Sequence, residues 1–291
     1  MSYGRRIAWL SSTNQKEKRR IIKSKNIVLF DMDGTLTPPR MEFDRTLLEP
    51  LRELTQYAQI GIVTGSDFDY VNQQMGYVIK HSELVYCMHI LPCNGTKWYP
   101  PLYSLGDSHC LKHEADMRLA LGSDTYRKLM LILLEQQLHF AENNIPLTGQ
   151  FIQYRGSMIN WCPIGRSATS EDRKRFVQHD KEKNQRLHYL NKVRRRLSLQ
   201  GLDKYITCTL GGDTSFDIYP TGWDKTYALR HFEDKGVWFV GDRCDKDGND
   251  KQIYDALSTL GRSYKTDSIA KTKEIIETIT AHFQSKENTN G

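Results

Sequence analysis

The chain has 291 residues, of which 38% are apolar and 26% charged, and this globular composition excludes a collagen, a mucin-like stalk and a wholly disordered chain. No run of 18 uncharged apolar residues exists, so no membrane span is predicted. The net charge of +6 arises at one end: residues 1–25 hold eight Lys or Arg and one acid, whereas the other 33 basic and 34 acidic residues sum to −1. We expect a disordered basic tail over 1–25, and binding of nucleic acid is not favoured.

The cysteines and the opening segment indicate the cellular compartment of the protein. Six cysteines are scattered along the chain without C-x-x-C pairs, which is unlike a disulfide framework or a zinc site. The opening segment lacks the apolar stretch of a secretory signal. These features predict reduced thiols and a cytoplasmic protein.

Strand and helix patterns alternate over the first hundred residues. The run NIVLF at 26–30 ends in DMDGT and predicts a buried parallel strand. Apolar residues over 47–58 are spaced for an amphipathic helix. A second strand is predicted at 60–63, with a helix after it, and a third strand at 84–90. This alternation favours a parallel sheet with helices on its faces.

The pattern changes after about residue 100. A helix is predicted over 124–140 by its Leu and Met spacing, and a long charged helix over 170–197. Strands are predicted at 151–154 and 158–161 on either side of a turn, and at 205–210 and 215–219. Paired strands with helices predict an α+β cap domain over 102–222, inserted into the sheet domain.

The first pattern returns at Trp223. A helix is predicted to start near Asp224, followed by a strand at 237–240 and a helix at 252–260. We therefore predict an α/β fold in which a core with a parallel sheet is split over 26–101 and 223–291.

Two carboxylates follow the first predicted strand. Asp31 and Asp33 lie in D-M-D-G-T, where strand carboxyl ends bind ligands in open parallel sheets, and Gly34 allows a tight turn. One carboxylate can attack phosphorus while binding a metal, and the other can exchange a proton with a hydroxyl. The alternative is a simple turn with exposed acids.

Three further segments are expected at the same edge of the sheet. Thr64 follows the second strand and offers a hydroxyl to a phosphate oxygen. Lys225 offers a cation, although such a lysine taken alone is more often a solvated surface residue. Asp242 follows the last strand, and Asn249 and Asp250 add hard oxygen ligands of the kind that Mg²⁺ prefers.

These four motifs, in this order, resemble those of the haloacid dehalogenase superfamily. The resemblance implies a Rossmann-like core, Mg²⁺ dependence and an aspartyl-phosphate intermediate. Asp31 would be the nucleophile and Asp33 the general acid/base, with Lys225 and Thr64 as further catalytic residues. The implied metal ligands are Asp31, Asp33, Asp242, Asn249 and Asp250.

A closer resemblance is to the eukaryotic-type phosphomannomutases, and it runs from about residue 26 to 282. The stretches FDMDGTLTPPR, FIQYRGSMINWCPIGRS, SFDIYPTGWDK and GDRCDKDGND carry it. It implies exchange of mannose 6-phosphate and mannose 1-phosphate for GDP-mannose synthesis, a hexose 1,6-bisphosphate activator and a homodimer through the cap. Guanidinium groups match phosphate oxygens well, which suits a bisphosphate. The implied substrate-binding residues are Arg40, Arg155, Arg166, Arg173, Ser215 and Asp217.

The chain also departs from that family. The family's N-G-M turn reads Gly156-Ser157-Met158 here, Thr64 stands where the mutases usually have Gly, and Cys93 replaces Glu in P-E-N-G. Two enzymatic alternatives therefore stay open: a sugar-phosphate phosphatase with the same motifs, and a hexose phosphomutase that also acts on glucose phosphates. A third alternative is a binding or regulatory protein on an inactive scaffold, but the motif acids and Lys225 are all present.

Overall fold

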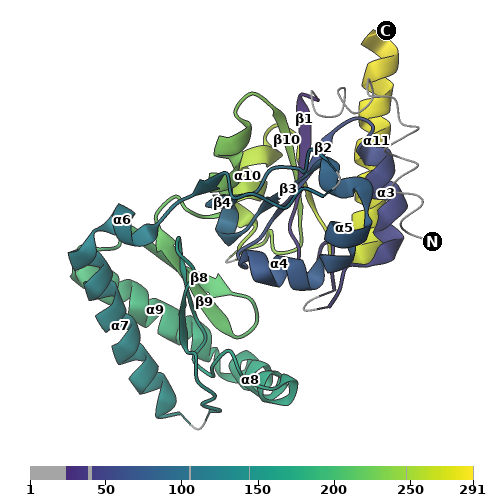
Figure 1. The fold of residues 1–291 in the computed structure, drawn as a ribbon. Coiled ribbons are helices and arrows are strands. Elements are labelled where there is room, and N and C mark those ends of the chain that lie inside the picture. The colour runs from purple at the N-terminus through teal and green to yellow at the C-terminus, as the bar shows by residue number, and fades with distance from the viewer. Residues whose placement is uncertain (1–23, 39–40, 105, 144, 247, 291) are drawn as a thin grey trace. The chain divides into compact units, whose positions relative to one another are not determined.

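The computed structural model describes residues 24–38, 41–104, 106–143, 145–246 and 248–290 (Figure 1). Arg40 and all but the last two residues of the predicted basic tail lie outside this part. The chain forms two compact units. Of the described residues, the core unit comprises those up to His113, those of Lys225–Lys246 and those from Asp250 onward, and the inserted unit comprises those of Glu114–Asp224 with the short segment before Asp250. The prediction placed the divisions at 101/102 and 222/223.

The core unit contains a five-stranded parallel sheet of order β11-β10-β1-β2-β3. β1 lies in the centre, with Asn26 paired to Gly236 on one side and Ile27 to Gln59 on the other. The prediction of an α/β core with a parallel sheet is confirmed. The strands are β1 (Asn26–Phe30), β2 (Gln59–Val63), β3 (Met88–Leu91), β10 (Gly236–Gly241) and β11 (Ser263–Lys265).

Both faces of this sheet are covered by helices, as its apolar strands require. Val28 and Phe30 of β1 pack in one cluster with α3, α4, α5 and α11, whereas Ile27 and Leu29 pack in another with α10 and a 3₁₀ helix. Figure 1 shows α3 and α11 side by side. The helices are α3 (Leu48–Leu54), α4 (Phe68–Gln74), α5 (Gly76–His81), α10 (Lys251–Ser258), α11 (Ile269–Asn290) and the 3₁₀ helix Lys225–Phe232.

Three local predictions for the core were wrong in detail. The helix predicted over 47–58 ends at Leu54, and a 3₁₀ turn precedes it. The strand predicted over 84–90 is a 3₁₀ helix, Glu83–Tyr86, before β3, because the Ser82 side chain accepts a hydrogen bond from Leu84 N and starts a turn. The helix near Asp224 is the 3₁₀ helix above.

The inserted unit has the predicted α+β character. Its antiparallel sheet has the order β6-β7-β9-β8, and one face packs against α7 and α9. The helix predicted over 170–197 is broken at Asn184, whose φ of 50° ends α8 in a left-handed turn. The elements are α6 (Met117–Leu121), α7 (Ser123–Ala141), β6 (Ile152–Tyr154), β7 (Ile159–Trp161), α8 (Ser170–Lys183), α9 (Gln185–Leu199), β8 (Ile206–Gly211) and β9 (Ser215–Pro220).

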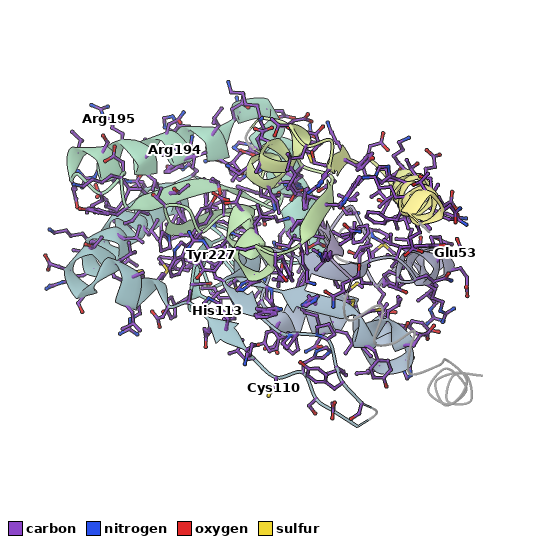
Figure 2. All side chains as sticks on the ribbon, turned by 90° about the horizontal axis from the view of Figure 1, so that it is seen from above. Glu53, Cys110, His113, Arg194, Arg195 and Tyr227 are labelled. Carbon is purple, nitrogen blue, oxygen red and sulfur yellow. The ribbon has the colours of Figure 1, made fainter. Side chains whose placement is uncertain are left out.

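The chain leaves the core unit at His113 and re-enters it at Lys225. Residues of the core unit next to these two points contact each other. β4 (Lys97–Trp98) pairs with β5 (His113–Glu114), and His113 Nε2 lies 3.0 Å from Tyr227 Oη (Figure 2). Nearby, buried His89 accepts a 3.0 Å hydrogen bond at Nδ1 from Trp98 Nε1. Burial, with smaller contributions from Lys235 and His231, lowers the pKa of His89 to about 3.

Two further observations concern the whole described chain. None of its helices in the described ranges combines the length and apolar character that crossing a bilayer requires. All six cysteines are free, and five of them are buried.

Candidate active site

The loop after β1 presents Asp31 at the carboxyl end of the sheet. A tight turn follows, in which Gly34 N donates to Thr37 O at 2.7 Å and Thr37 N to Met32 O at 3.0 Å. Gly34 has a φ of +86°, and a Cβ there would lie 2.4 Å from Asp242 Oδ2. The turn and the close approach therefore both require glycine.

Three carboxylates meet at this edge. One oxygen each from Asp31, Asp242 and Asp250 lie within 4.8 Å of one another. They come from the ends of β1 and β10 and the start of α10. We call Asp31, Asp242 and Asp250 the acid group. The predicted convergence of strand ends is thus observed for these residues.

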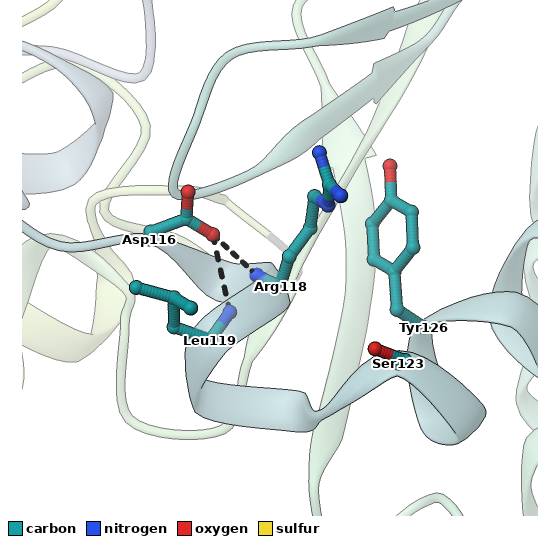
Figure 3. A pocket seen from close by; sticks show the side chains of 5 residues that line it. All are labelled: Asp116, Arg118, Leu119, Ser123 and Tyr126. Carbon is teal, nitrogen blue, oxygen red and sulfur yellow. Dashed lines mark hydrogen bonds between the residues drawn. The ribbon is translucent and has the colours of Figure 1, made fainter.

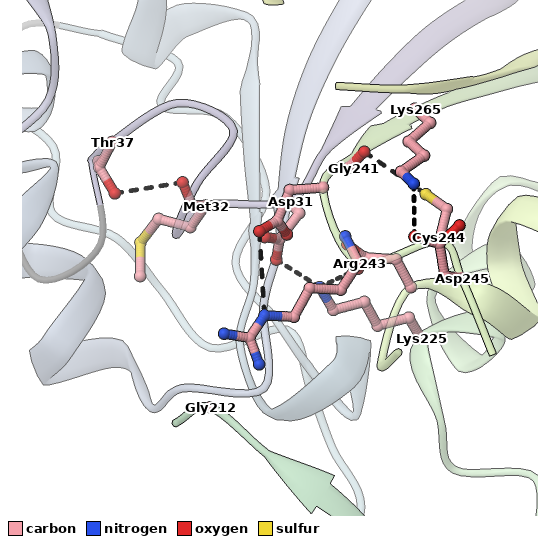
Figure 4. Close-up of polar contacts among 12 residues, drawn as sticks. Asp31, Met32, Thr37, Gly212, Lys225, Gly241, Arg243, Cys244, Asp245 and Lys265 are labelled. Atoms are coloured by element: carbon pink, nitrogen blue, oxygen red, sulfur yellow. Dashed lines mark hydrogen bonds and ion pairs between the residues drawn. The ribbon is translucent and has the colours of Figure 1, made fainter. Parts of the chain in front are cut away.

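Lys225 is the cation of this site. Its side chain is 0% exposed, and Nζ donates to Asp31 Oδ1 and, at 2.5 Å, to Asp250 Oδ1 (Figure 4). Asp250 Oδ2 also accepts from Arg243 N at 3.0 Å. The alternative of a solvated surface lysine is therefore excluded, since an ammonium group is buried only where such partners compensate it.

Two members of the acid group, Asp31 and Asp242, have raised pKa values. Burial raises the pKa of Asp31 well above its usual range; Lys225 opposes this, and the other two carboxylates add to it. Burial and Asp250 raise the pKa of Asp242 to about 6. Burial alone would lower the pKa of Lys225, but the carboxylates of Asp250 and Asp31 outweigh it and raise that pKa. Lys225 therefore stays charged.

The donor set fits a divalent hard cation. Three carboxylates and one ammonium leave a formal charge of −2, from three minus charges and one plus. Within the acid group, Asp242 Oδ1 is a buried oxygen with no hydrogen-bond donor among the described residues; Asn249 belongs to the inserted unit and stays a predicted ligand. Hard oxygen ligands of this kind, with a need for positive charge, match Mg²⁺.

Asp33 is held differently. Its carboxylate lies outside the acid group, and Oδ1 accepts from Gln74 Nε2 at 3.2 Å and Tyr70 Oη at 3.4 Å. Both donors belong to α4, four residues apart and so on one helix face. Sequence reasoning missed these two residues, although the helix predicted after T-G-S-D carries them.

Thr64 follows β2 and is buried. Its hydroxyl accepts from Ser66 N at 3.1 Å, and its carbonyl oxygen accepts from Asn94 N at 2.8 Å. Cys93 and Asn94 both have positive φ, 52° and 63°, a conformation that is uncommon outside glycine. The loop that replaces P-E-N-G is therefore strained where it contacts Thr64.

Each of the predicted arginines of the inserted unit donates hydrogen bonds to other residues of that unit. Arg155 Nη2 donates to Gln153 Oε1 at 3.4 Å, and Arg166 Nη1 to Asn160 Oδ1 at 3.2 Å. Arg173 donates to Thr214 Oγ1 at 2.8 Å and to the carbonyls of Arg166, Gly165 and Ala168. Arg173 thus braces the loop that carries Arg166.

Ser215 and Asp217 lie on β9, on the sheet face opposite the apolar core. Their neighbours Phe216 and Ile218 pack in that core, as strand alternation requires. Both accept hydrogen bonds from the side chain of Asn160, at 3.0 Å and 2.8 Å. The structure therefore brings Arg166, Ser215 and Asp217 together through a residue that the sequence did not single out.

A separate pocket of about 440 Å³ opens at the start of α6 and α7 (Figure 3). Asp116 at its edge accepts from Arg118 N, Leu119 N and, at 3.0 Å, Tyr154 Oη. None of the predicted site residues lines it, so it plays no part in the chemistry considered below. Its lining residues are Asp116, Arg118, Leu119, Ser123 and Tyr126.

Known proteins match this chain over most of its length. The sequence profile of the family described as eukaryotic phosphomannomutase matches residues 47–280. A phosphomannomutase of Arabidopsis thaliana is 36% identical over 253 residues, 86% of this chain and 96% of that protein. One of Schizosaccharomyces pombe is 34% identical, covering 86% and 94%. A mutant IMP-nucleotidase of Plasmodium falciparum has a similar fold, with a TM-score of 0.58 at 14% identity over 92% of this chain and 69% of its own.

Proposed function

This chain belongs to the eukaryotic phosphomannomutase family, and from that premise we propose that it interconverts mannose 6-phosphate and mannose 1-phosphate. The observation that carries the proposal is the buried contact of Lys225 with Asp31 and Asp250. It brings a nucleophile and a cation together at the carboxyl ends of parallel strands. The product would feed GDP-mannose synthesis.

The reaction consists of phosphoryl transfers to and from Asp31. A carboxylate oxygen of Asp31 attacks a phosphorus of a hexose 1,6-bisphosphate; the bond to the sugar oxygen breaks, and Asp33 gives that oxygen a proton. In the reverse step a hydroxyl of the hexose monophosphate loses its proton to Asp33 and attacks the aspartyl phosphate. When the sugar turns round between the two steps, the phosphate has moved between O1 and O6.

Asp33 and Lys225 do different work in this scheme. The hydrogen bonds from Gln74 and Tyr70 orient the Asp33 carboxylate, which supports its role in proton transfer. Lys225 offsets the charge of the phosphoryl group, and such electrostatic positioning supplies most of the catalysis in this chemistry. Mg²⁺, for which the acid group with Asn249 and Asp33 would be the ligands, supplies further charge neutralisation when bound.

In this proposal the sugar is bound by the cap, residues 102–222, and the chemistry belongs to the core, 26–101 and 223–291. Arg155 and Arg166, with Arg173 and Arg40, would bind the phosphate that is not being transferred. Ser215 and Asp217 would bind sugar hydroxyls. A cap that opens and closes would let the sugar turn round and would exclude water.

Two enzymatic alternatives have support from particular residues. A sugar-phosphate phosphatase is favoured by the Thr64 hydroxyl, which stands where mutases usually have glycine. Action on glucose phosphates is open because the two hexoses differ in one hydroxyl group. The family resemblance is the basis for a homodimer through the cap, and the free thiols support a cytoplasmic location.

One assay separates these activities. The full chain is incubated with mannose 1-phosphate, Mg²⁺ and a trace of glucose 1,6-bisphosphate, and phosphorus NMR follows the products. We expect mannose 6-phosphate without inorganic phosphate. Inorganic phosphate alone would overturn the mutase proposal in favour of a phosphatase, and the same assay with glucose 1-phosphate measures the sugar preference.

A further inference from the structure

Asn160 lies at the centre of the polar groups of the inserted unit. Its side-chain NH₂ donates to Ser215 Oγ at 3.0 Å and to Asp217 Oδ1 at 2.8 Å. Its Oδ1 accepts from Arg166 Nη1 at 3.2 Å. Every polar atom of this amide is therefore bonded to a predicted substrate-binding residue.

The orientation of the amide follows from its partners. Ser215 Oγ donates to Gly211 O at 2.9 Å, so it accepts from Asn160. A carboxylate only accepts and a guanidinium only donates, so the nitrogen of Asn160 faces Asp217 and the oxygen faces Arg166. The nitrogen also donates to Phe216 O at 3.5 Å, and Asn160 is only 3% exposed, so the amide is held by its partners within the buried interior.

The sheet fixes where Asn160 stands. It pairs with Gln153 of β6 on one side and Asp217 of β9 on the other, and Asp217 pairs in turn with Thr209 of β8. These four residues form one row across the sheet, which we call the polar row. Gln153 extends it to Arg155 by the 3.4 Å hydrogen bond.

We propose that Asn160 is a positioning residue for sugar-phosphate recognition, an inference that rests on the proposed function. Asn160 holds a guanidinium, a hydroxyl and a carboxylate at fixed spacing, which are the groups that bind a phosphate and two hydroxyls of one hexose phosphate. Its partners would contact the sugar phosphate in both the ground state and the transition state. Its loss is therefore expected to raise KM more than it lowers kcat.

The test compares two isosteric changes of a buried amide in the same unit. Asn160→Asp replaces both N–H donors by an oxygen that repels Asp217. Gln137→Glu is the matched control, because buried Gln137 accepts from Trp161 Nε1 at 2.7 Å and donates to Pro163 O at 3.1 Å. Both variants replace an NH₂ by an oxygen that faces an acceptor, so both are expected to lower the thermal midpoint.

The readouts are KM, kcat and the calorimetric Kd for mannose 6-phosphate, measured on the full chain with Mg²⁺. We expect Asn160→Asp to raise KM and Kd by about 10- to 100-fold and to change kcat by less than about fivefold, as misplacement of binding groups predicts. Gln137→Glu is expected to change KM and Kd less than twofold. If Asn160→Asp does not fold, Asn160→Ser, which keeps a hydrogen-bonding side chain, replaces it with a smaller expected rise.

The outcomes separate this inference from the proposed function. A wild-type Kd retained by the Asn160 variant, or an equal loss in both variants, overturns the positioning role. Binding of mannose 6-phosphate without turnover overturns the mutase while the comparison of Kd values still decides on Asn160. NMR of the Arg166 Nε–H group gives a second readout: a sharp resonance in the wild type and in Gln137→Glu, and exchange broadening in Asn160→Asp, support the role.

Discussion

The acid group of the core unit and the polar row of the inserted unit assemble polar side chains in opposite ways. In the core, the acid group and Lys225 come from separate segments, and buried Lys225 contacts Asp31 and Asp250 directly, with the pKa values of Asp31 and Lys225 raised. In the inserted unit, Ser215 and Asp217 on one strand and Arg166 on a loop are hydrogen-bonded to a neutral amide on the neighbouring strand. The first arrangement concentrates charge, and the second fixes spacing.

This difference between the two regions predicts that the acid group mainly determines kcat and that the polar row mainly determines KM. Charges in a buried site act strongly on charge that develops during a reaction, so changes in the acid group should lower kcat. Fixed spacing between hydrogen-bonding groups governs how well a bound molecule fits, so changes in the polar row should raise KM. The predictions below test this division, beginning with the largest expected effect.

Asp31→Asn should lower kcat by at least about 10⁴-fold, because the amide cannot form the aspartyl phosphate. The amide keeps the size of the side chain, and Lys225 keeps its buried ion pair with Asp250, so the thermal midpoint should stay near the wild-type value. Steady-state kinetics and thermal denaturation measure both effects. Activity within tenfold of the wild type would show that Asp31 is not the nucleophile, and the acid group would then not be the region that sets the rate.

Lys225→Met should affect both rate and stability. It leaves Asp31 and Asp250 buried without their shared cation, which is expected to destabilise the fold by about 3–5 kcal/mol, and kcat should fall by about 10³-fold. Denaturant titration gives the free energy of unfolding. Millimolar Mg²⁺ should restore part of the lost stability, since a second cation then faces the carboxylates; a variant as stable as the wild type would contradict the account of the acid group.

Two glycines allow the same substitution to be made in both regions, although only Gly34 has a positive φ. A Cβ at Gly34 would meet Asp242 Oδ2 at 2.4 Å, and one at Gly211 would meet the Asp217 carboxylate at 2.6 Å. Gly34→Ala should lower kcat by about 10²-fold, whereas Gly211→Ala should raise KM by about tenfold with little change in kcat. The same kinetic split in both variants would show that the two regions do not divide rate and affinity.

The smallest expected effect is on stability and comes from His89, which belongs to neither the acid group nor the polar row. The folded pKa of His89 is about 3 against about 6.5 when unfolded, so the unfolded chain binds a proton first as pH falls. Stability from this group is full above pH 6.5 and is lost on acidification, by about 2 kcal/mol between pH 7 and pH 5. Urea titrations should show this loss, and His89→Gln should reduce it without changing kcat or KM. An equal loss in the variant would assign it to other groups.

The sequence allowed the core site to be predicted more fully than the inserted one. Asp31 and Asp33 form a local motif at a strand end, and the parallel sheet dictates that other strand ends meet there. What could not be predicted was the burial of Lys225, because it depends on the contact with Asp250, 25 residues later.

The inserted unit shows why its site was harder to predict. Arg166, Ser215 and Asp217 were named by resemblance, but their common partner Asn160 lies within an apolar run, I-N-W, that reads as part of a buried strand. The role of Asn160 depends on the register between β7 and β9, which no local pattern specifies. The break of the charged helix at Asn184 was missed for a related reason, since its neighbours have the composition of one continuous helix.

The position of β1 in the sheet has a consequence for synthesis of the protein. β1 pairs on one side with β2, which is translated soon afterwards, and on the other with β10, which begins at Gly236. Until β10 leaves the ribosome, β1 is an open edge of a partly built sheet, the kind of surface on which nascent chains aggregate. The inserted unit is nearly contiguous in sequence and can fold earlier. The solubility of the nascent chain should therefore depend on how quickly the last fifty or so residues, which include β10, are synthesised after the inserted unit.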